Sequence, residues 1–168
     1  MTIENQNLIG SLPSDLRTLI DEASLLEIVL ESVADVGAVG RKAFNSASVR
    51  PESSAPMMLT LLTYSYAAGI FGSRDIEAAI YQDRTLRYIC AHKYPTWHDI
   101  RRFRRLHREW VQKILGATLT EVSVQYLFPF YPETAGNPPR SDFDAQVAMA
   151  VAGRLEAAII MDGVEMDV

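Results

Sequence analysis

A mainly α-helical fold is the class that the sequence predicts, and two observations lead to it. Apolar residues recur at intervals of three and four residues through most of the chain, and residues typical of helix starts and stops bound those stretches. The 168 residues are 48% hydrophobic and 22% charged, which is ordinary for a soluble protein with a sizeable core. We expect a compact multi-helix domain over residues 1–116, followed by an acidic extension over 117–168 that packs on this domain or on a partner.

The N-terminal part predicts two helices. Ser14 or Asp15 can cap a first helix that ends near Ala23, because either side chain accepts hydrogen bonds from free backbone N–H groups. Apolar residues then continue at helical spacing until Gly37 and Gly40, which are expected to end the second helix.

The middle of the chain predicts a connector and three helices. Residues 40–56 are rich in Ser, Ala and Pro and are expected to form the connector. Residues 56–72 are apolar nearly all round, which indicates a buried helix at the centre of the domain. Two short helices, 74–81 and 84–91, are expected to follow.

A long helix is expected over 97–115, begun by Thr96 or Asp99 and ended by Gly116. Together with the helix at 84–91 it predicts a helix-turn-helix-like pair.

The last fifty residues predict a different type of structure from the helical domain. Residues 121–131 (EVSVQYLFPFY) alternate partly between polar and apolar side chains, which favours a strand or an extended arm. No basic residue interleaves with its aromatic residues, so we expect these rings to pack on the core or on a partner rather than to stack on bases. A loop over 132–139, a final helix over 143–158 and an acidic tail complete the chain.

The helix expected over 97–115 carries two stripes of side chains. Its apolar stripe consists of Ile100, Phe103, His107, Trp110 and Ile114. Its second stripe consists of Arg101, Arg104, Arg105 and Arg108. A guanidinium group binds phosphate through two parallel hydrogen bonds, so this stripe is the candidate DNA-binding surface, together with Lys93 near the preceding turn. The alternative is an ordinary solvated face whose acidic partners come from the two ends of the chain.

The distribution of charge leaves both interpretations open. The chain has a net charge of −5, and its first 52 residues carry 4 basic and 8 acidic side chains. Residues 74–113 carry 10 basic and 5 acidic side chains, whereas residues 114–168 carry 2 and 8. The whole molecule therefore repels a polyanion at long range, while its middle can attract one locally.

Neither catalytic nor cofactor chemistry is predicted. The one cysteine, Cys90, lies in an apolar setting typical of an inert buried thiol. Its spacing from His92, His98 and His107 does not match a zinc site. The sequence also lacks a G-x-S-x-G elbow and a phosphate-binding glycine loop. We expect no metal, no cofactor and no enzyme activity.

A cytoplasmic location is expected. The N-terminus shows no secretory signal, and the single cysteine forms no internal disulfide. The longest uncharged stretch, residues 53–73, is too polar to span a membrane.

Three blocks of sequence occur in an order and spacing that point to a known family. They are PMMLTLLTY at 56–64, SRDIE at 73–77, and RYI at 87–89 followed by Pro95 and by IRRFRRLH at 100–107. With these blocks, residues 56–107 resemble the InsH-type N-terminal domain of insertion-sequence (DDE-type) transposases.

The resemblance implies a helical module that binds the ends of a mobile element and helps to assemble a dimer. Its matched basic positions are Arg74, Arg101 and Arg104, and its matched core positions are Ile76, Ile100 and Phe103. In full-length relatives an RNase H-like domain with two Asp and one Glu holds two metal ions and performs the chemistry. The chain departs from the family at Asp99, where a threonine is usual, and at Gly72, where a serine is usual.

Residues 160–164 (IMDGV) loosely echo the strand that carries the first catalytic Asp of the family. One carboxylate cannot hold two metals, so we expect Asp162 to be a surface residue and the catalytic domain to be absent.

The leading hypothesis is a non-catalytic DNA-binding module that recognises inverted-repeat ends or modulates a transposase. The alternatives are a protein-interaction module, as a homodimer or with a full-length transposase, and an inactive truncated remnant that binds no DNA.

Overall fold

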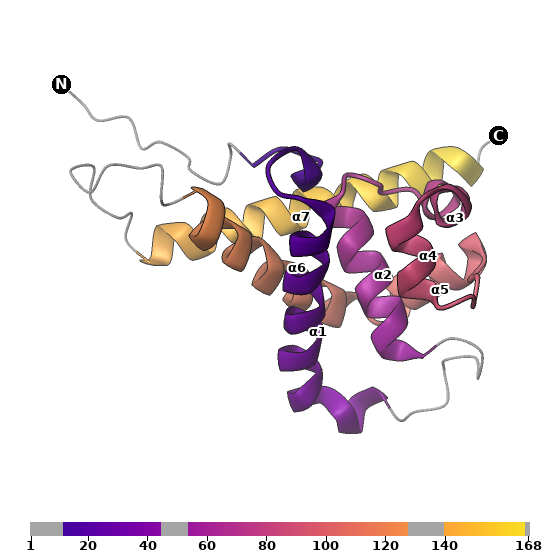
Figure 1. The fold of residues 1–168 in the computed structure, drawn as a ribbon, viewed down its shortest axis with the longest axis horizontal. Coiled ribbons are helices and arrows are strands. Elements are labelled where there is room, and N and C mark those ends of the chain that lie inside the picture. Colours follow the sequence, from indigo (N-terminus) through magenta and orange to yellow (C-terminus); the bar gives the residue numbers. More distant parts are fainter. Residues whose placement is uncertain (1–11, 45–53, 128–139, 167–168) are drawn as a thin grey trace.

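The computed structural model describes residues 12–44, 54–127 and 140–166, and the regular elements in these ranges are all helical (Figure 1). The α-helices are α1 (Glu22–Phe44), α2 (Ala55–Ala67), α3 (Ser73–Gln82), α4 (Arg84–Cys90), α5 (Trp97–Leu106), α6 (Arg108–Val122) and α7 (Arg140–Met166). A 3-10 helix, Leu16–Thr18, precedes α1, and a π-helical turn, Ser123–Leu127, continues α6. The predicted helical fold class is confirmed.

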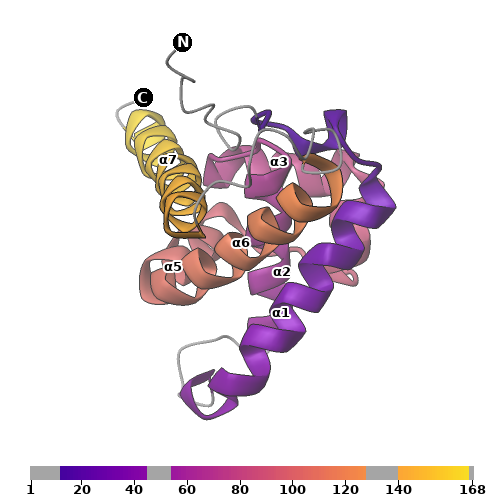
Figure 2. The ribbon, with the colours of Figure 1, turned by 90° about the vertical axis from the view of Figure 1, so that its left-hand side faces the viewer.

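Three helices form the centre of the fold. α1, α2 and α6 pack against one another, and α6 lies between α1 and α7 (Figure 2). α7 runs along α6 and reaches α3. α3, α4 and α5 gather at the side of α2, where α4 and α5 each contact both α2 and α3 (Figure 1).

The central position of α2 follows from its sequence. Ser54 caps the helix by accepting a hydrogen bond from the backbone N–H of Met57, and Pro56 stands in the first turn, where its missing N–H costs nothing. Eleven of its thirteen residues are buried, as the all-round apolar pattern predicts. After α2, Gly69 adopts a φ of +77°, and a Cβ there would lie 3.1 Å from the carbonyl oxygen of Ser14.

The N-terminal helices begin and end at other residues than the sequence predicts. The first is only the 3-10 helix at Leu16–Thr18, capped by Asp15, which accepts from the backbone N–H of Arg17. α1 then continues through Gly37 and Gly40 to Phe44, so these glycines do not end it. A glycine inside a helix costs about 1 kcal/mol relative to alanine, which the packing of a long helix can offset.

The long helix expected over 97–115 is two helices, because the chain breaks at His107 (φ −119°, ψ 29°). The imidazole ring of His107 packs against Phe103 with 4.5 Å between ring centroids, and burial lowers its pKa. Gly116 does not end the second helix. It faces α7, where an added Cβ would lie 3.9 Å from Val151. The glycine therefore lies inside α6, on the side that faces α7, rather than at a helix end.

The strand or extended arm expected over 121–131 is wrong for residues 121–127, which the structure describes as helical. α6 runs to Val122 and the π-helical turn to Leu127, while residues 128–131 lie outside the described ranges. Buried residues at helical spacing continue the apolar stripe of α6 past Gly116 and account for the longer helix: Leu115, Thr118, Leu119 and Val122. Tyr126 packs against the core, as expected for the aromatic residues of this segment.

α7 is longer than the predicted helix over 143–158 and extends to Met166. Its contacts with α6 and α3 place the C-terminal extension on the helical domain, and α6 itself crosses the expected boundary at residue 116.

Truncation of a buried leucine tests the central role of α2. Leu62 is fully buried, so Leu62→Ala should lower the free energy of unfolding by about 2–5 kcal/mol, because it removes apolar packing and leaves an unfilled cavity. Urea denaturation followed by circular dichroism measures this. Leu30→Ala is the matched control, because Leu30 is 44% exposed on α1 and its truncation should cost less than about 0.5 kcal/mol. Equal losses of stability for both variants would contradict the assignment.

Candidate functional site

The helix that carries the predicted arginine stripe starts with a reciprocal cap. Thr96 Oγ1 accepts a hydrogen bond from the backbone N–H of Asp99, and the Asp99 carboxylate accepts one from the backbone N–H of Thr96 at 3.1 Å. This capping box satisfies two otherwise free donors at the start of α5. It fixes where the helix begins, and with it the direction in which the arginines point.

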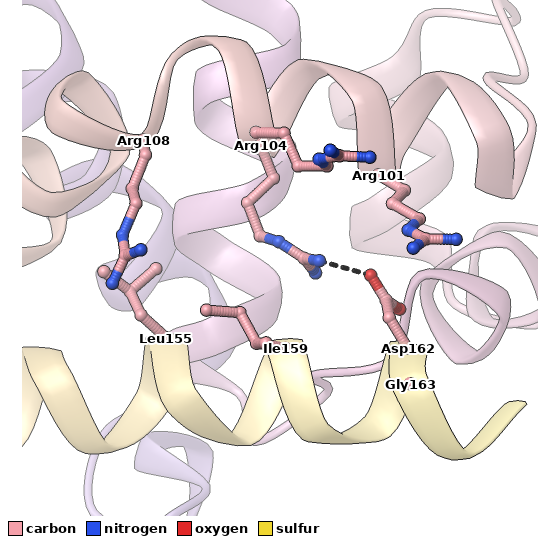
Figure 3. A pocket seen from close by; sticks show the side chains of 8 residues that line it. Arg101, Arg104, Arg108, Leu155, Ile159, Asp162 and Gly163 are labelled. Atoms are coloured by element: carbon pink, nitrogen blue, oxygen red, sulfur yellow. Dashed lines mark ion pairs between the residues drawn. The ribbon is translucent and has the colours of Figure 1, made fainter. Parts of the chain in front are cut away.

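A pocket of about 440 Å³ opens between α5, the start of α6 and α7 (Figure 3). Its lining consists of Arg101, Arg104, Arg105, Arg108, Leu155, Ile159, Asp162 and Gly163. The four arginines of the predicted stripe therefore do come together. Four guanidinium groups face one carboxylate, which leaves the lining with an excess of positive charge.

Arg104 and Asp162 form a buried ion pair at the base of this pocket (Figure 3). Their residues are only 5% and 4% exposed. The guanidinium of Arg104 also donates to the carbonyl oxygen of Ala158 at 3.4 Å. Two expectations are thus wrong: Arg104 does not lie on the exposed face, and Asp162 is not a surface residue.

Asp162 also holds the start of α3. Its carboxylate oxygens accept hydrogen bonds from the backbone N–H and the hydroxyl of Ser73, at 2.8 and 2.9 Å. The first backbone N–H groups of a helix have no partner within the helix, and the helix dipole favours a negative charge there. One carboxylate therefore joins α7 to both α3 and α5.

Tyr66 lies beside this pair and stays neutral. Burial raises the pKa of its hydroxyl to about 12, although Arg104 opposes the shift. Burial by itself would lower the pKa of Arg104, but Tyr66 and Asp162 outweigh this and hold that pKa above its ordinary value. The guanidinium of Arg104 therefore keeps its charge at neutral pH.

The remaining pocket arginines differ in exposure. Arg101 is half-buried, whereas Arg105 and Arg108 are exposed. Within the described ranges, neither Arg105 nor Arg108 forms an ion pair with an acidic side chain. Arg108 extends toward α7 next to Leu155 (Figure 3). The pocket thus combines two exposed guanidinium groups with an apolar wall.

The other two predicted site residues lie outside the pocket. Arg74 is exposed on α3, with its guanidinium carbon 4.7 Å from the ring centroid of Trp97. Lys93 is exposed in the turn between α4 and α5. Of the helix-turn-helix-like pair, α4 matches the predicted 84–91, but the second helix ends at Leu106 instead of 115.

That residues of α7 line the pocket was not predicted from the sequence. A signal for it existed: buried residues recur along α7 at Val147, Val151, Leu155 and Ala158. Four residues after Ala158 the same stripe reaches Asp162. A buried acidic residue needs a cationic partner. The position of Asp162 on this stripe therefore indicated that its carboxylate pairs with an arginine inside the fold.

Other chemistry finds little support in the described ranges. They contain no group of three or more His, Cys, Asp or Glu residues that could hold a metal ion. Cys90 is buried, as predicted, and burial raises the pKa of its thiol to about 11. None of the described helices is both long enough and apolar enough to cross a membrane.

Removing the carboxylate of Asp162 tests the buried pair. Asp162→Ala leaves the charge of Arg104 buried without its partner and frees the start of α3, so the free energy of unfolding should fall by about 3–5 kcal/mol. Urea denaturation at neutral pH measures the loss. The control is Asp144→Ala, an exposed aspartate on the same helix, which should change stability by less than about 0.5 kcal/mol.

A second variant separates the pair from simple packing. In Arg104→Met/Asp162→Leu both charges are replaced by apolar groups of similar volume, so the part of the loss that comes from an unpaired buried charge should return, whereas the part that comes from the lost hydrogen bonds to Ser73 should remain. A single variant Asp162→Ala as stable as the unsubstituted chain would show that the pair does not hold α7.

Comparison with known proteins identifies the helical domain. Residues 14–106, more than half of the 168-residue chain, match the family model described as transposase domain (DUF772). No match was found among curated proteins or solved structures. The matched range runs from the 3-10 helix to the end of α5, so it contains one wall of the pocket and not α7. It includes nearly all of residues 56–107, on which the resemblance to transposases rests. The chain belongs to this family of transposase domains.

Proposed function

We propose that this chain is a DNA-binding module related to transposition, and that it holds a backbone phosphate in the pocket between α5 and α7. The observation that carries the proposal is the gathering of Arg101, Arg105 and Arg108 around one cavity. Membership of a transposase domain family supports DNA as the polyanion.

The chemistry of the pocket fits a phosphodiester. A guanidinium group donates two parallel hydrogen bonds to phosphate oxygens, and several guanidinium groups can neutralise a charge that none of them neutralises alone. The volume of about 440 Å³ lies within the range of ligand sites. Leu155 and Ile159 offer an apolar wall against which the sugar of a nucleotide can lie.

The buried ion pair accounts for the division of labour among the arginines. Asp162 neutralises Arg104, so Arg104 positions α7 and does not compete for the ligand. Arg105 and Arg108 supply the exposed charge. In a chain with a net charge of −5, such binding depends on local attraction and should weaken steeply with salt.

A second candidate function is self-association through the outer face of α7. Met149, Ile160 and Val164 are 70%, 56% and 59% exposed. Their spacing of eleven and four residues places them on one side of the helix. An exposed apolar stripe of this kind is typical of an interface with another protein. Light scattering of the unsubstituted chain and of Ile160→Glu separates this function from DNA binding, because the substitution lies outside the pocket lining.

Substitution of the exposed pocket arginines tests the proposal. Arg105→Ala/Arg108→Ala should weaken binding of a fluorescein-labelled duplex by tenfold or more, because removal of such charge-assisted hydrogen bonds costs about 1–3 kcal/mol. Fluorescence anisotropy at two or more salt concentrations measures this. The slope of log K against log salt should become less steep by about 0.9 for each phosphate that the variant no longer neutralises.

The matched control is Arg102→Ala, which removes an exposed arginine of α5 that does not line the pocket. Its effect on affinity should be small. The proposal fails if the unsubstituted chain does not bind duplex at low salt, or if Arg102→Ala weakens binding as much as the double variant.

A further inference from the structure

A row of aromatic rings lies on the outside of α3, away from the pocket lining. The rings of Tyr81, at the end of α3, and Tyr94, in the turn before α5, stack with 5.2 Å between centroids and an angle of 19°. The two residues are 59% and 41% exposed. The stack is therefore open to solvent and does not belong to the core.

The row continues at the other end of α3. The ring of Trp97 stacks on that of His98 with 3.5 Å between centroids, and the guanidinium of Arg74 lies over Trp97. Arg74 and Tyr81 are seven residues apart on α3, so they share one face of the helix. Segment 94–98 thus runs antiparallel to α3, and the two together form what we call the aromatic strip: Arg74, Tyr81, Tyr94, Trp97 and His98.

The turn that leads into the strip has an uncommon backbone. Ala91 and His92 adopt φ values of +47° and +66°, in the left-handed region that residues with a Cβ rarely occupy. Three backbone hydrogen bonds hold the turn: Ala91 N–H donates to the carbonyl oxygens of Arg87 and Tyr88, and Lys93 N–H donates to that of Cys90. This turn ends α4 and directs Tyr94 back onto Tyr81. The strip is consequently formed before any ligand binds.

An exposed cationic side chain lies at each end of the strip. Residues 84–108 contain eight Lys or Arg and a single acidic residue, whereas residues 73–83, which include α3, contain one Arg and three acidic residues. Lys93 is exposed next to Tyr94, and Arg74 is exposed at the other end. The nearby acidic side chain of Glu77 is already bound, because it accepts the backbone N–H of Trp97 at 3.2 Å. An exposed aromatic surface with a cationic side chain at each end fits a polyanion that also presents flat rings.

We propose that the aromatic strip binds unpaired bases of a single DNA strand. The bases would stack on the exposed rings of Tyr81, Tyr94 and His98, because the His98 ring and the Arg74 guanidinium already cover Trp97. Lys93 and Arg74 would contact the phosphates on either side. Seven residues of α3 span about 10 Å. That length matches about three bases at the 3.4 Å spacing of a stacked strand. The inference rests on the proposed function, since it assumes that the ligand is DNA, but it uses different residues and a different form of DNA.

Three ten-nucleotide probes labelled with fluorescein test the strip by anisotropy: single-stranded oligo(dT), an abasic strand with the same phosphates, and a duplex. The abasic strand should bind at least tenfold more weakly than oligo(dT), because it offers charge without rings. Tyr81→Leu/Tyr94→Leu should weaken oligo(dT) binding by tenfold or more and leave duplex binding unchanged. The control is Tyr88→Leu, which removes a tyrosine that is 71% exposed on α4 and outside the strip.

A second readout needs no substitution in the strip. The chain has two tryptophans, so in Trp110→Phe the fluorescence comes from Trp97 alone. Stacking of a base on His98, which lies against Trp97, should quench this fluorescence when oligo(dT) is added and not when the abasic strand is added. Equal binding of the abasic strand and oligo(dT), or absence of quenching at saturation, would overturn the inference. Loss of duplex binding in Arg105→Ala/Arg108→Ala with oligo(dT) binding retained would support both proposals as separate sites. Absence of binding to all three probes would overturn both.

Discussion

The arrangement of this domain around its pocket depends on one buried ion pair. Arg104 and Asp162 are 58 residues apart in sequence and lie on different helices, α5 and α7. Burying two charges costs free energy that their attraction only partly returns, so such a pair is weak support for stability as a whole. It is a strong constraint on geometry, however, because either charge alone would be buried without a partner. Since Asp162 also binds Ser73, the pair fixes α7 against α5 and α3 together. Without that placement the pocket would lack its second wall.

The same pair explains how an acidic protein can present a basic site. The acidic C-terminal part does fold onto the basic middle, as one of the alternatives expected, but its contact at the pocket uses one carboxylate for one arginine. The side chains of Arg105 and Arg108 remain exposed to solvent. At the start of α5, the capping box and the turn at Ala91 and His92 position the aromatic strip along α3. Two surfaces, the pocket and the aromatic strip, thus follow from how α5 begins and how α7 ends.

Structural features that depend on the local pattern of side chains could be predicted from the sequence. The buried helix at 55–67, the start of α5 at Thr96 and the burial of Cys90 all follow from the nature of neighbouring side chains. The break at His107 and the passage of α6 through Gly116 did not follow, because a glycine that faces another helix looks in sequence like one that ends a helix. Likewise, spacing cannot distinguish Arg104 from Arg105. Only the arrival of Asp162 from a distant helix makes one buried and structural and leaves the other exposed.

The most direct test of the account is a nuclear magnetic resonance titration of the arginine side chains. The Nε–H signals of the uniformly ¹⁵N-labelled chain would be followed while a short duplex is added, with assignments from the single variants. The account predicts that the signals of Arg105 and Arg108 shift together with the backbone amides of α7 near Ile159, while the signal of Arg104 stays nearly constant because its partner is Asp162. Shifts confined to other surfaces, with Arg105 and Arg108 unchanged at saturation, would contradict it.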